Sequence, residues 1–94
     1  MATKTDYEIA VVYQGRHLTD KGVARLLFND ANTGTIESAV DWMLANCTNL
    51  NNINVATALQ CLYYDFIGVS SNALWQKIDD YCDKLVEQGK INEW

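Results

Sequence analysis

The stretch NVATALQCLYYDFIG, residues 54–68, decides the fold of this chain. Apolar side chains recur in it every three or four residues, which is the period of a helix with one buried face. Asn54 suits the N-cap position, and Gly68 suits the stop because glycine readily adopts the left-handed conformation that ends many helices. We therefore predict a helix whose buried stripe consists of Val55, Ala58, Leu59, Leu62, Tyr63 and Phe66.

Two more segments with the same period lie on either side of this stretch. Residues 36–47 follow Thr35, and residues 72–88 follow Ser71 or Asn72; each of these polar residues can cap a helix. The first apolar stripe is Ile36, Val40, Met43, Leu44 and Cys47. The second is Leu74, Ile78, Tyr81 and Leu85, widened by Trp75, Cys82 and Val86. Both segments are predicted to be helices.

The first thirty residues allow two interpretations. Residues 7–13 are rich in β-branched and aromatic side chains, which suits a strand. A capping box at residues 5–8 and a stop at Gly15 favour a helix instead. Residues 23–28 could supply a partner strand, although residues 19–29 fit a helix slightly better. We expect helices in both places and keep a short N-terminal strand as the alternative.

The chain has 94 residues, of which 49% are hydrophobic and 20% charged, so it has the size and composition of one globular domain. We expect a mainly α fold over residues 1–94, a compact bundle of four to five short helices. The longest strictly apolar runs are too short to span a membrane, and the polar N-terminus does not resemble a secretory signal. The expected location is cytoplasmic.

Negative charge is concentrated in the C-terminal two-thirds of the chain. Residues 1–30 hold four acids and four bases, whereas residues 31–94 hold eight acids and three lysines, which accounts for the whole net charge of −5. No Lys or Arg occurs between Arg25 and Lys77. Nucleic acids are bound chiefly through clustered Lys and Arg, so direct nucleic-acid binding is disfavoured. A protein partner with a basic surface fits this charge better.

The sequence offers little for catalysis or metal binding. Cys47, Cys61 and Cys82 are far apart with no Cys-x-x-Cys spacing, and His17 is the only histidine. This pattern argues against a disulfide framework and a zinc site. The five glycines are scattered, so they form no phosphate-binding loop. We expect no cofactor, no metal and no catalytic site; an enzyme would need a reactive thiol, for which Cys61 is the candidate.

Two sets of side chains are candidates for binding a partner. Asp79, Asp83 and Glu87 follow one another at four-residue spacing on the last predicted helix, where like charges repel and the C-terminal dipole disfavours anions. The alternative is a solvated face. The second set consists of large aromatic residues off the core stripes or at the chain end, which either anchor a partner or pack against the N-terminal segment. They are Trp42, Tyr64, Trp75 and Trp94.

The fourteen residues from Gly68 to Tyr81 resemble the turn and recognition helix of Fis-type helix-turn-helix domains. The framework positions that agree are Gly68, Val69, Ser70, Asn72, Leu74, Trp75, Lys77, Ile78 and Tyr81. The resemblance implies a helix-turn-helix-like C-terminal pair of helices over residues 66–81.

The charged positions depart from that family. Ser71 and Gln76 stand where the family has arginines, and Asp79 stands where it has a basic residue. Tyr64 occupies a position where the family has a small alanine. The groups that would contact phosphate are therefore missing or reversed, and the resemblance does not extend to DNA binding.

These observations favour a small acidic protein-interaction module, specifically an inhibitor that occupies a basic, nucleic-acid-binding surface of its partner. In size and acidity the chain is similar to small phage-encoded inhibitors such as anti-CRISPR proteins. The alternative is a dimeric helix-turn-helix regulator of transcription, with phosphate contacts from Lys4, Arg16, Lys21 and Arg25. The broad apolar face of the last helix would also allow a homodimer.

Overall fold

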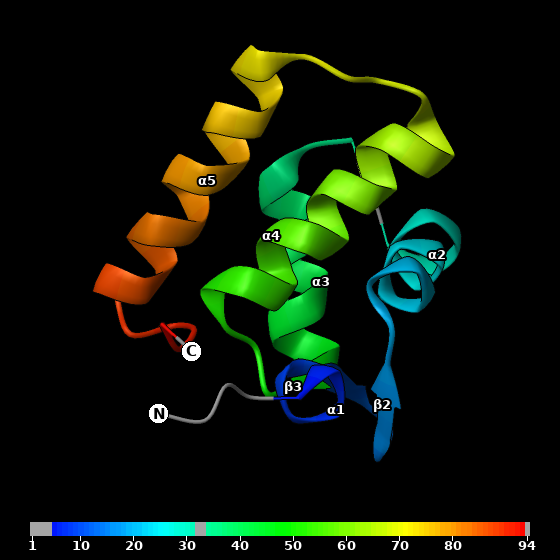
Figure 1. Cartoon of the computed structure of the whole chain (residues 1–94), viewed down its shortest axis with the longest axis vertical. Helices are drawn as coiled ribbons and strands as arrows, with labels where there is room; N and C mark the ends of the chain where they lie inside the picture. The colour runs from blue at the N-terminus through cyan, green and yellow to red at the C-terminus, as the bar shows by residue number, and fades with distance from the viewer. Residues whose placement is uncertain (1–4, 32–33, 94) are drawn as a thin grey trace.

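A computed structural model describes residues 5–31 and 34–93. The chain is mainly helical, with a short three-stranded sheet near the N-terminus (Figure 1). The segment Leu62–Ile67 is a π-helix, η1, that continues the α-helix Asn52–Cys61, α4, without a break. In chain order the elements are α1 (Asp6–Ile9), β1 (Val11–Tyr13), β2 (Arg16–Leu18), α2 (Asp20–Asp30), α3 (Ile36–Asn46), β3 (Cys47–Thr48), α4 (Asn52–Cys61), η1 (Leu62–Ile67) and α5 (Asn72–Glu87).

The sheet has the strand order β2-β1-β3, and both pairings are antiparallel. β1 and β2 form a hairpin in which Val11 faces Leu18 and Tyr13 faces Arg16. Gln14 and Gly15 close it with φ angles of 52° and 78°. Two successive positive φ angles are what a tight two-residue turn between twisted strands requires.

The helix expected at residues 7–13 is therefore wrong from Val11 onward, and the alternative strand is correct there. Only a four-residue helix, α1, precedes it, with Thr5 Oγ1 accepting a hydrogen bond of 3.2 Å from the Glu8 backbone N–H. Gly15 belongs to the hairpin turn rather than to a helix stop. The partner strand was missed because it is only three residues long and has an exposed, polar sequence.

The remaining helices follow the apolar stripes. The segments predicted at 19–29, 36–47, 54–68 and 72–88 correspond to α2, α3, α4 with η1, and α5. Two predicted caps are present, since Thr35 accepts from the Ser38 N–H at 3.0 Å and Ser71 accepts from the Leu74 N–H at 3.1 Å. The stripe residues supply most of the core.

The start of α4 differs from the prediction. Asn51, not Asn54, is the N-cap, and the two side chains form a reciprocal capping box with bonds of 2.9 and 3.0 Å. Asn54 is buried, and its Nδ2 donates to the backbone carbonyls of Ile9 and Asn49, each at 2.7 Å. This side chain therefore ties α4 to the segment that leads into β1.

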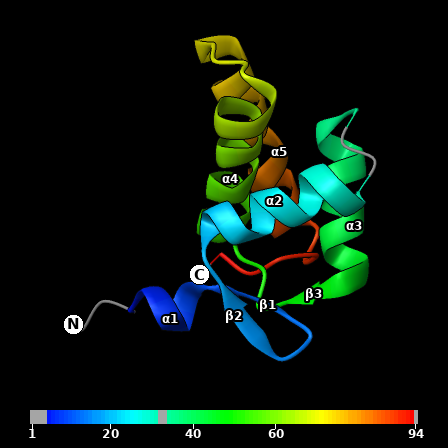
Figure 2. The same ribbon diagram turned by 90° about the vertical axis from the view of Figure 1, so that its right-hand side faces the viewer.

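α4 lies in the middle of the molecule, with α5 on one side and α2 on the other (Figure 1). The sheet and α1 lie together at one end (Figure 2). The largest fully buried side chains come from all of the longer helices and include Leu27, Met43, Leu59, Ile78 and Leu85. One face of α4 stays outside this core, between α5 and the junction of β2 with α2.

Candidate functional site

The carboxylates of Asp79, Asp83 and Glu87 are exposed on consecutive turns of α5, and we call them the acidic row. Side chains four residues apart on a helix are surface neighbours, so their charges reinforce one another. The two lysines of α5 lie on a different side, because Lys77 and Lys84 line a hollow with residues of α3. The acidic row therefore holds negative charge without an interleaved base.

A side-chain hydrogen bond places the acidic row beside α4. The Nδ2 of Asn52, the first residue of α4, donates to Asp83 Oδ1 at 2.8 Å. The backbone of Asn52 is itself held, since its N–H donates to the carbonyl of Asn92 at 2.9 Å. A hydrogen bond to an ionised acceptor is stronger than one between neutral groups. Asp83 is therefore held at the edge of α4.

The other end of the row begins at an aromatic pocket. Trp75 precedes Asp79 by one turn of α5 and is half-buried against the core. It lines an open pocket of about 470 Å³ together with Tyr64, whose side chain is 63% exposed. The remaining lining residues are Asp20, Lys21, Thr57, Gln60, Cys61 and Asp65. Two aromatic residues singled out from the sequence thus meet at one place, which we call the Tyr64–Trp75 pocket.

The π-helix η1 presents one wall of this pocket. Leu62 is fully buried, whereas Tyr64 and Asp65 are exposed. On another side of η1, the Phe66 ring contacts Phe28 of α2 with a centroid separation of 5.6 Å. π-helical turns are rare and occur frequently at functional sites. In η1 the first side chain, Leu62, is thus buried, while Tyr64 and Asp65 face the solvent and are available to a partner.

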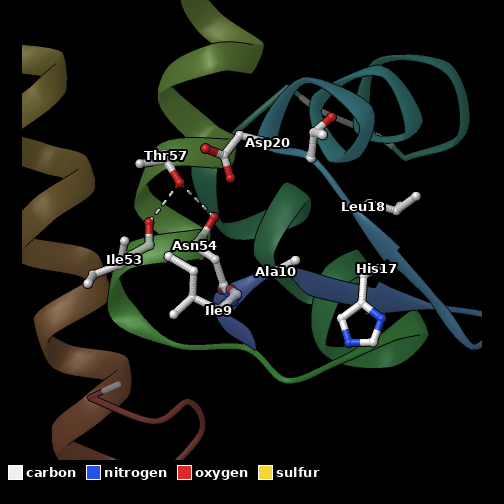
Figure 3. A pocket seen from close by; sticks show the side chains of 9 residues that line it. Ile9, Ala10, His17, Leu18, Asp20, Ile53, Asn54 and Thr57 are labelled. Atoms are coloured by element: carbon white, nitrogen blue, oxygen red, sulfur yellow. Dashed lines mark hydrogen bonds between the residues drawn. The ribbon is translucent and has the colours of Figure 1, made fainter. Parts of the chain in front are cut away.

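A second pocket, of about 460 Å³, lies at the N-terminal half of α4 (Figure 3). Much of its wall is apolar, from Ile9, Ala10, Leu18 and Ile53, and its polar lining comprises His17, Thr19, Asp20, Asn54 and Thr57. The Thr57 hydroxyl donates to the carbonyl of Ile53 at 2.8 Å, so it is already engaged.

The two pockets share Asp20 and Thr57. They are therefore adjacent on the exposed face of α4, and we call the two together the α4 trough. From Ile53 to Tyr64 this face extends about 16 Å, given the 1.5 Å rise per residue of an α-helix. Figure 3 shows Asp20 reaching from the start of α2 toward α4.

Carboxylates gather around Cys61 in the trough. Burial raises the pKa of the Cys61 thiol to about 11, with a further rise from its Sγ–H hydrogen bond of 3.1 Å to Asp65 Oδ2. The charges of Asp65 and Asp20 also raise this pKa, and the charge of Lys21 lowers it. The thiol therefore stays neutral near pH 7, which makes it a poor nucleophile.

Trp42, which was also singled out from the sequence, does not join this site. The Trp42 ring is half-buried and stacks on Tyr13 of β1, with centroids 5.7 Å apart and an interplanar angle of 27°. Trp42 therefore packs against the N-terminal segment, which was the alternative role for these aromatics. Trp94 lies outside the described residues.

Of the residues that line the trough, only Tyr64 and Trp75 were predicted to bind a partner. Asp20, Ile53 and Asp65 are among those that were missed. Asp20 and Ile53 come close only because the junction of β2 with α2 folds against α4, and no periodicity encodes that contact. The position of Asp65 in the sequence, by contrast, did indicate that it belongs to this site. It follows Tyr64 directly, and it lies one turn after Cys61 on the side of the helix away from the core stripe.

No protein-family model matches the chain, and no curated protein or solved structure is significantly similar to it. Within residues 5–31 and 34–93, no group of three or more His, Cys, Asp or Glu side chains is placed to hold a metal ion. None of the helices in those ranges has both the length and the apolar character needed to cross a lipid bilayer.

Proposed function

We propose that this protein is an interaction module that binds a basic surface of a partner protein through the acidic row and the α4 trough. The observation that carries the proposal is that the acidic row begins at the Tyr64–Trp75 pocket. Trp75 lies one turn before Asp79 on α5. Charge for steering and aromatic groups for anchoring are therefore available on one face.

The two components have separate physical roles. Exposed carboxylates attract a cationic partner over several ångströms and orient it, although each exposed pair adds little to affinity. Tyr and Trp are the residue types that most often supply the binding energy at the centre of an interface. Two carboxylates, Asp20 and Asp65, line the trough. Among the lining residues of the two pockets, Lys21 is the only Lys or Arg, so the trough adds to the negative charge of the acidic row.

An inhibitor that covers a nucleic-acid-binding surface is the form of this function that we favour. Such surfaces carry the clustered Lys and Arg that a row of carboxylates would meet, and covering them blocks access of phosphates. In this proposal the protein acts in the cytoplasm without a cofactor and without catalysis, in the manner of small phage-encoded anti-CRISPR proteins.

A helix-turn-helix regulator is the alternative. One observation favours it: Gly68, at φ 84°, ends η1 and Ser71 caps α5, so a short turn joins the two helices where the Fis-like motif would have it. In that fold α5 would be the recognition helix and enter the major groove of DNA. It would bring the acidic row toward phosphates, which is why we favour the protein-binding function.

Affinity capture with DNA competition tests the proposal. The immobilised bait is the wild-type chain or one of two variants that each lose three exposed carboxylates. The row variant is Asp79→Asn, Asp83→Asn and Glu87→Gln, and the matched control is Asp30→Asn, Glu37→Gln and Asp41→Asn. We expect wild type and control to retain the same proteins, the row variant to lose them, and duplex DNA to displace them.

Two results would refute the proposal. Retention that is equal for the row variant and the wild type would remove the role of the acidic row. A mobility shift of duplex DNA by the wild-type chain alone would support the regulator instead, since we expect no retardation. Capture at low and at moderate salt adds a further check, because steering by exposed charge weakens as salt rises.

A further inference from the structure

The Tyr64–Trp75 pocket combines features that suit a cation with a flat, apolar face. Its two aromatic residues differ in exposure, because Trp75 packs partly against the core whereas Tyr64 is 63% exposed. The side chain of Tyr64 is therefore accessible from solvent. Aromatic faces attract cations, most strongly at Trp.

The charges around the pocket leave one negative charge to be balanced. Asp20 and Asp65 are carboxylates, Lys21 is a cation, and the Cys61 thiol is neutral. One oxygen of Asp65 accepts from Cys61, which leaves the other Asp65 oxygen and the carboxylate of Asp20 as acceptors. One positively charged group from a partner would neutralise the pocket.

We propose that the Tyr64–Trp75 pocket receives one arginine side chain of the partner protein, with the guanidinium stacked on the aromatic faces and bonded to Asp65. This inference rests on the proposed function, because it assigns the anchor of the same basic partner. Arginine fits better than lysine since its planar guanidinium both stacks on rings and pairs with carboxylates through several N–H groups. The volume of about 470 Å³ lies within the range of pockets that hold small ligands.

NMR titration with small amides tests the pocket without a known partner. The ligands are the Nα-acetyl N-methylamides of arginine, lysine and citrulline, the last being a neutral analogue of arginine. The readouts are the backbone amides of residues 60–66 and the indole N–H of Trp75, which a Trp75→Phe variant identifies. We expect saturable shifts at these positions with arginine, weaker shifts with lysine and none with citrulline.

Substitutions of Tyr64 and Asp65 measure how much each side chain contributes to arginine binding. Tyr64→Ser should weaken arginine binding about two- to fivefold, the range expected for loss of an exposed cation–π contact. Asp65→Asn should weaken it by a similar factor, and the double variant about tenfold. Both residues are exposed, so the variants are expected to fold, and Asp30→Asn is the matched control that should bind like wild type.

Three outcomes would overturn the assignment: lysine that binds as tightly as arginine, citrulline that binds as tightly as arginine, or shifts that Tyr64→Ser leaves unchanged. Titration with hexa-arginine distinguishes failure of the pocket assignment from failure of the proposed function. If hexa-arginine shifts the amides of the acidic row equally in wild type and Tyr64→Ser, the pocket inference falls and the proposed function stands. If hexa-arginine binds to neither protein, the proposed function falls as well.

Discussion

Asn52 and Asp83 join the first turn of α4 to the middle of the acidic row through a hydrogen bond of 2.8 Å. The two residues are 31 positions apart, and the bond lies at the surface. Asp83 would otherwise only repel its neighbours on the helix. The bond therefore offsets part of that repulsion and sets the position of the row relative to the α4 trough.

Replacement of Asn52 by alanine should lower the free energy of unfolding by about 0.5–1 kcal/mol, the value of an exposed hydrogen bond to a charged group. Urea unfolding measures this change. A double-mutant cycle with Asp83→Ala isolates the pair, because Asp83→Ala alone also relieves repulsion. Additive effects of the two substitutions would mean that the bond contributes nothing.

Replacement of Asn54 by alanine should be much more costly. It removes the partner of the Ile9 and Asn49 carbonyls, which are partly buried, and of the Asn51 N–H, which is buried. We expect a loss of about 2–4 kcal/mol in unfolding free energy, since each unsatisfied buried group costs about 1–3 kcal/mol. The exposed Asn46, which donates one bond to the Trp42 carbonyl, is the control; equal losses for both would contradict the role of Asn54.

Cys61 should react slowly with an alkylating agent, although its thiol is partly exposed. A rise in its pKa from 9.0 to about 11 lowers the thiolate fraction at pH 8 about 100-fold. The greater nucleophilicity of the more basic thiolate recovers about tenfold, which leaves labelling about tenfold slower than for an ordinary cysteine. Mass spectrometry after iodoacetamide treatment measures this rate, and Asp65→Asn should increase it. Rapid, selective labelling at neutral pH would instead support an enzyme.

Stability should fall as the pH rises above 9. Burial, followed by the charges of Asp79 and Asp83, raises the pKa of Cys82 to about 12 in the folded protein. The unfolded chain releases this proton near pH 9, so between pH 9 and 12 the folded state binds more protons and loses about 1.4 kcal/mol of stability per pH unit from this thiol.

The Cys82→Ala variant is the control for this pH dependence. Its stability at neutral pH will be lower, because Cys82 is fully buried and its removal leaves a cavity. Its loss of stability above pH 9, followed by thermal unfolding, should nevertheless be shallower than in wild type. Parallel curves for the two proteins would exclude Cys82 as the titrating group.

The helices were predictable because each buries a stripe that repeats with the helical period, as Ile78 and Leu85 do in α5. The hairpin was not, because β1 and β2 are three residues each and the turn at Gln14 and Gly15 has no Asn-Gly signature. The N-cap of α4 was displaced by three residues because the run from Asn49 to Asn54 offers several capping side chains.

The candidate site was predictable only in part. The exposure of the acidic row follows from its place opposite the stripe of α5, and the exposure of Tyr64 follows from its place off the stripe of the preceding helix. Trp42 also lies off the stripe of its helix, but its ring stacks on Tyr13. Tyr13 belongs to β1, a strand that we did not favour from the sequence. Asp20 entered the trough through a tertiary contact that no local pattern encodes.

The affinity of a fluorescent hexa-arginine peptide tests directly whether the acidic row binds a basic partner. Fluorescence anisotropy measures this affinity at low and at moderate salt. We expect the row variant to bind about tenfold more weakly than wild type, since it removes three exposed charge contacts of about 0.2–1 kcal/mol each. The matched control should stay within about twofold of wild type, because its three carboxylates lie outside the binding face. Equal weakening of the two variants would mean that the peptide responds only to net charge, which would exclude the acidic row as the binding surface.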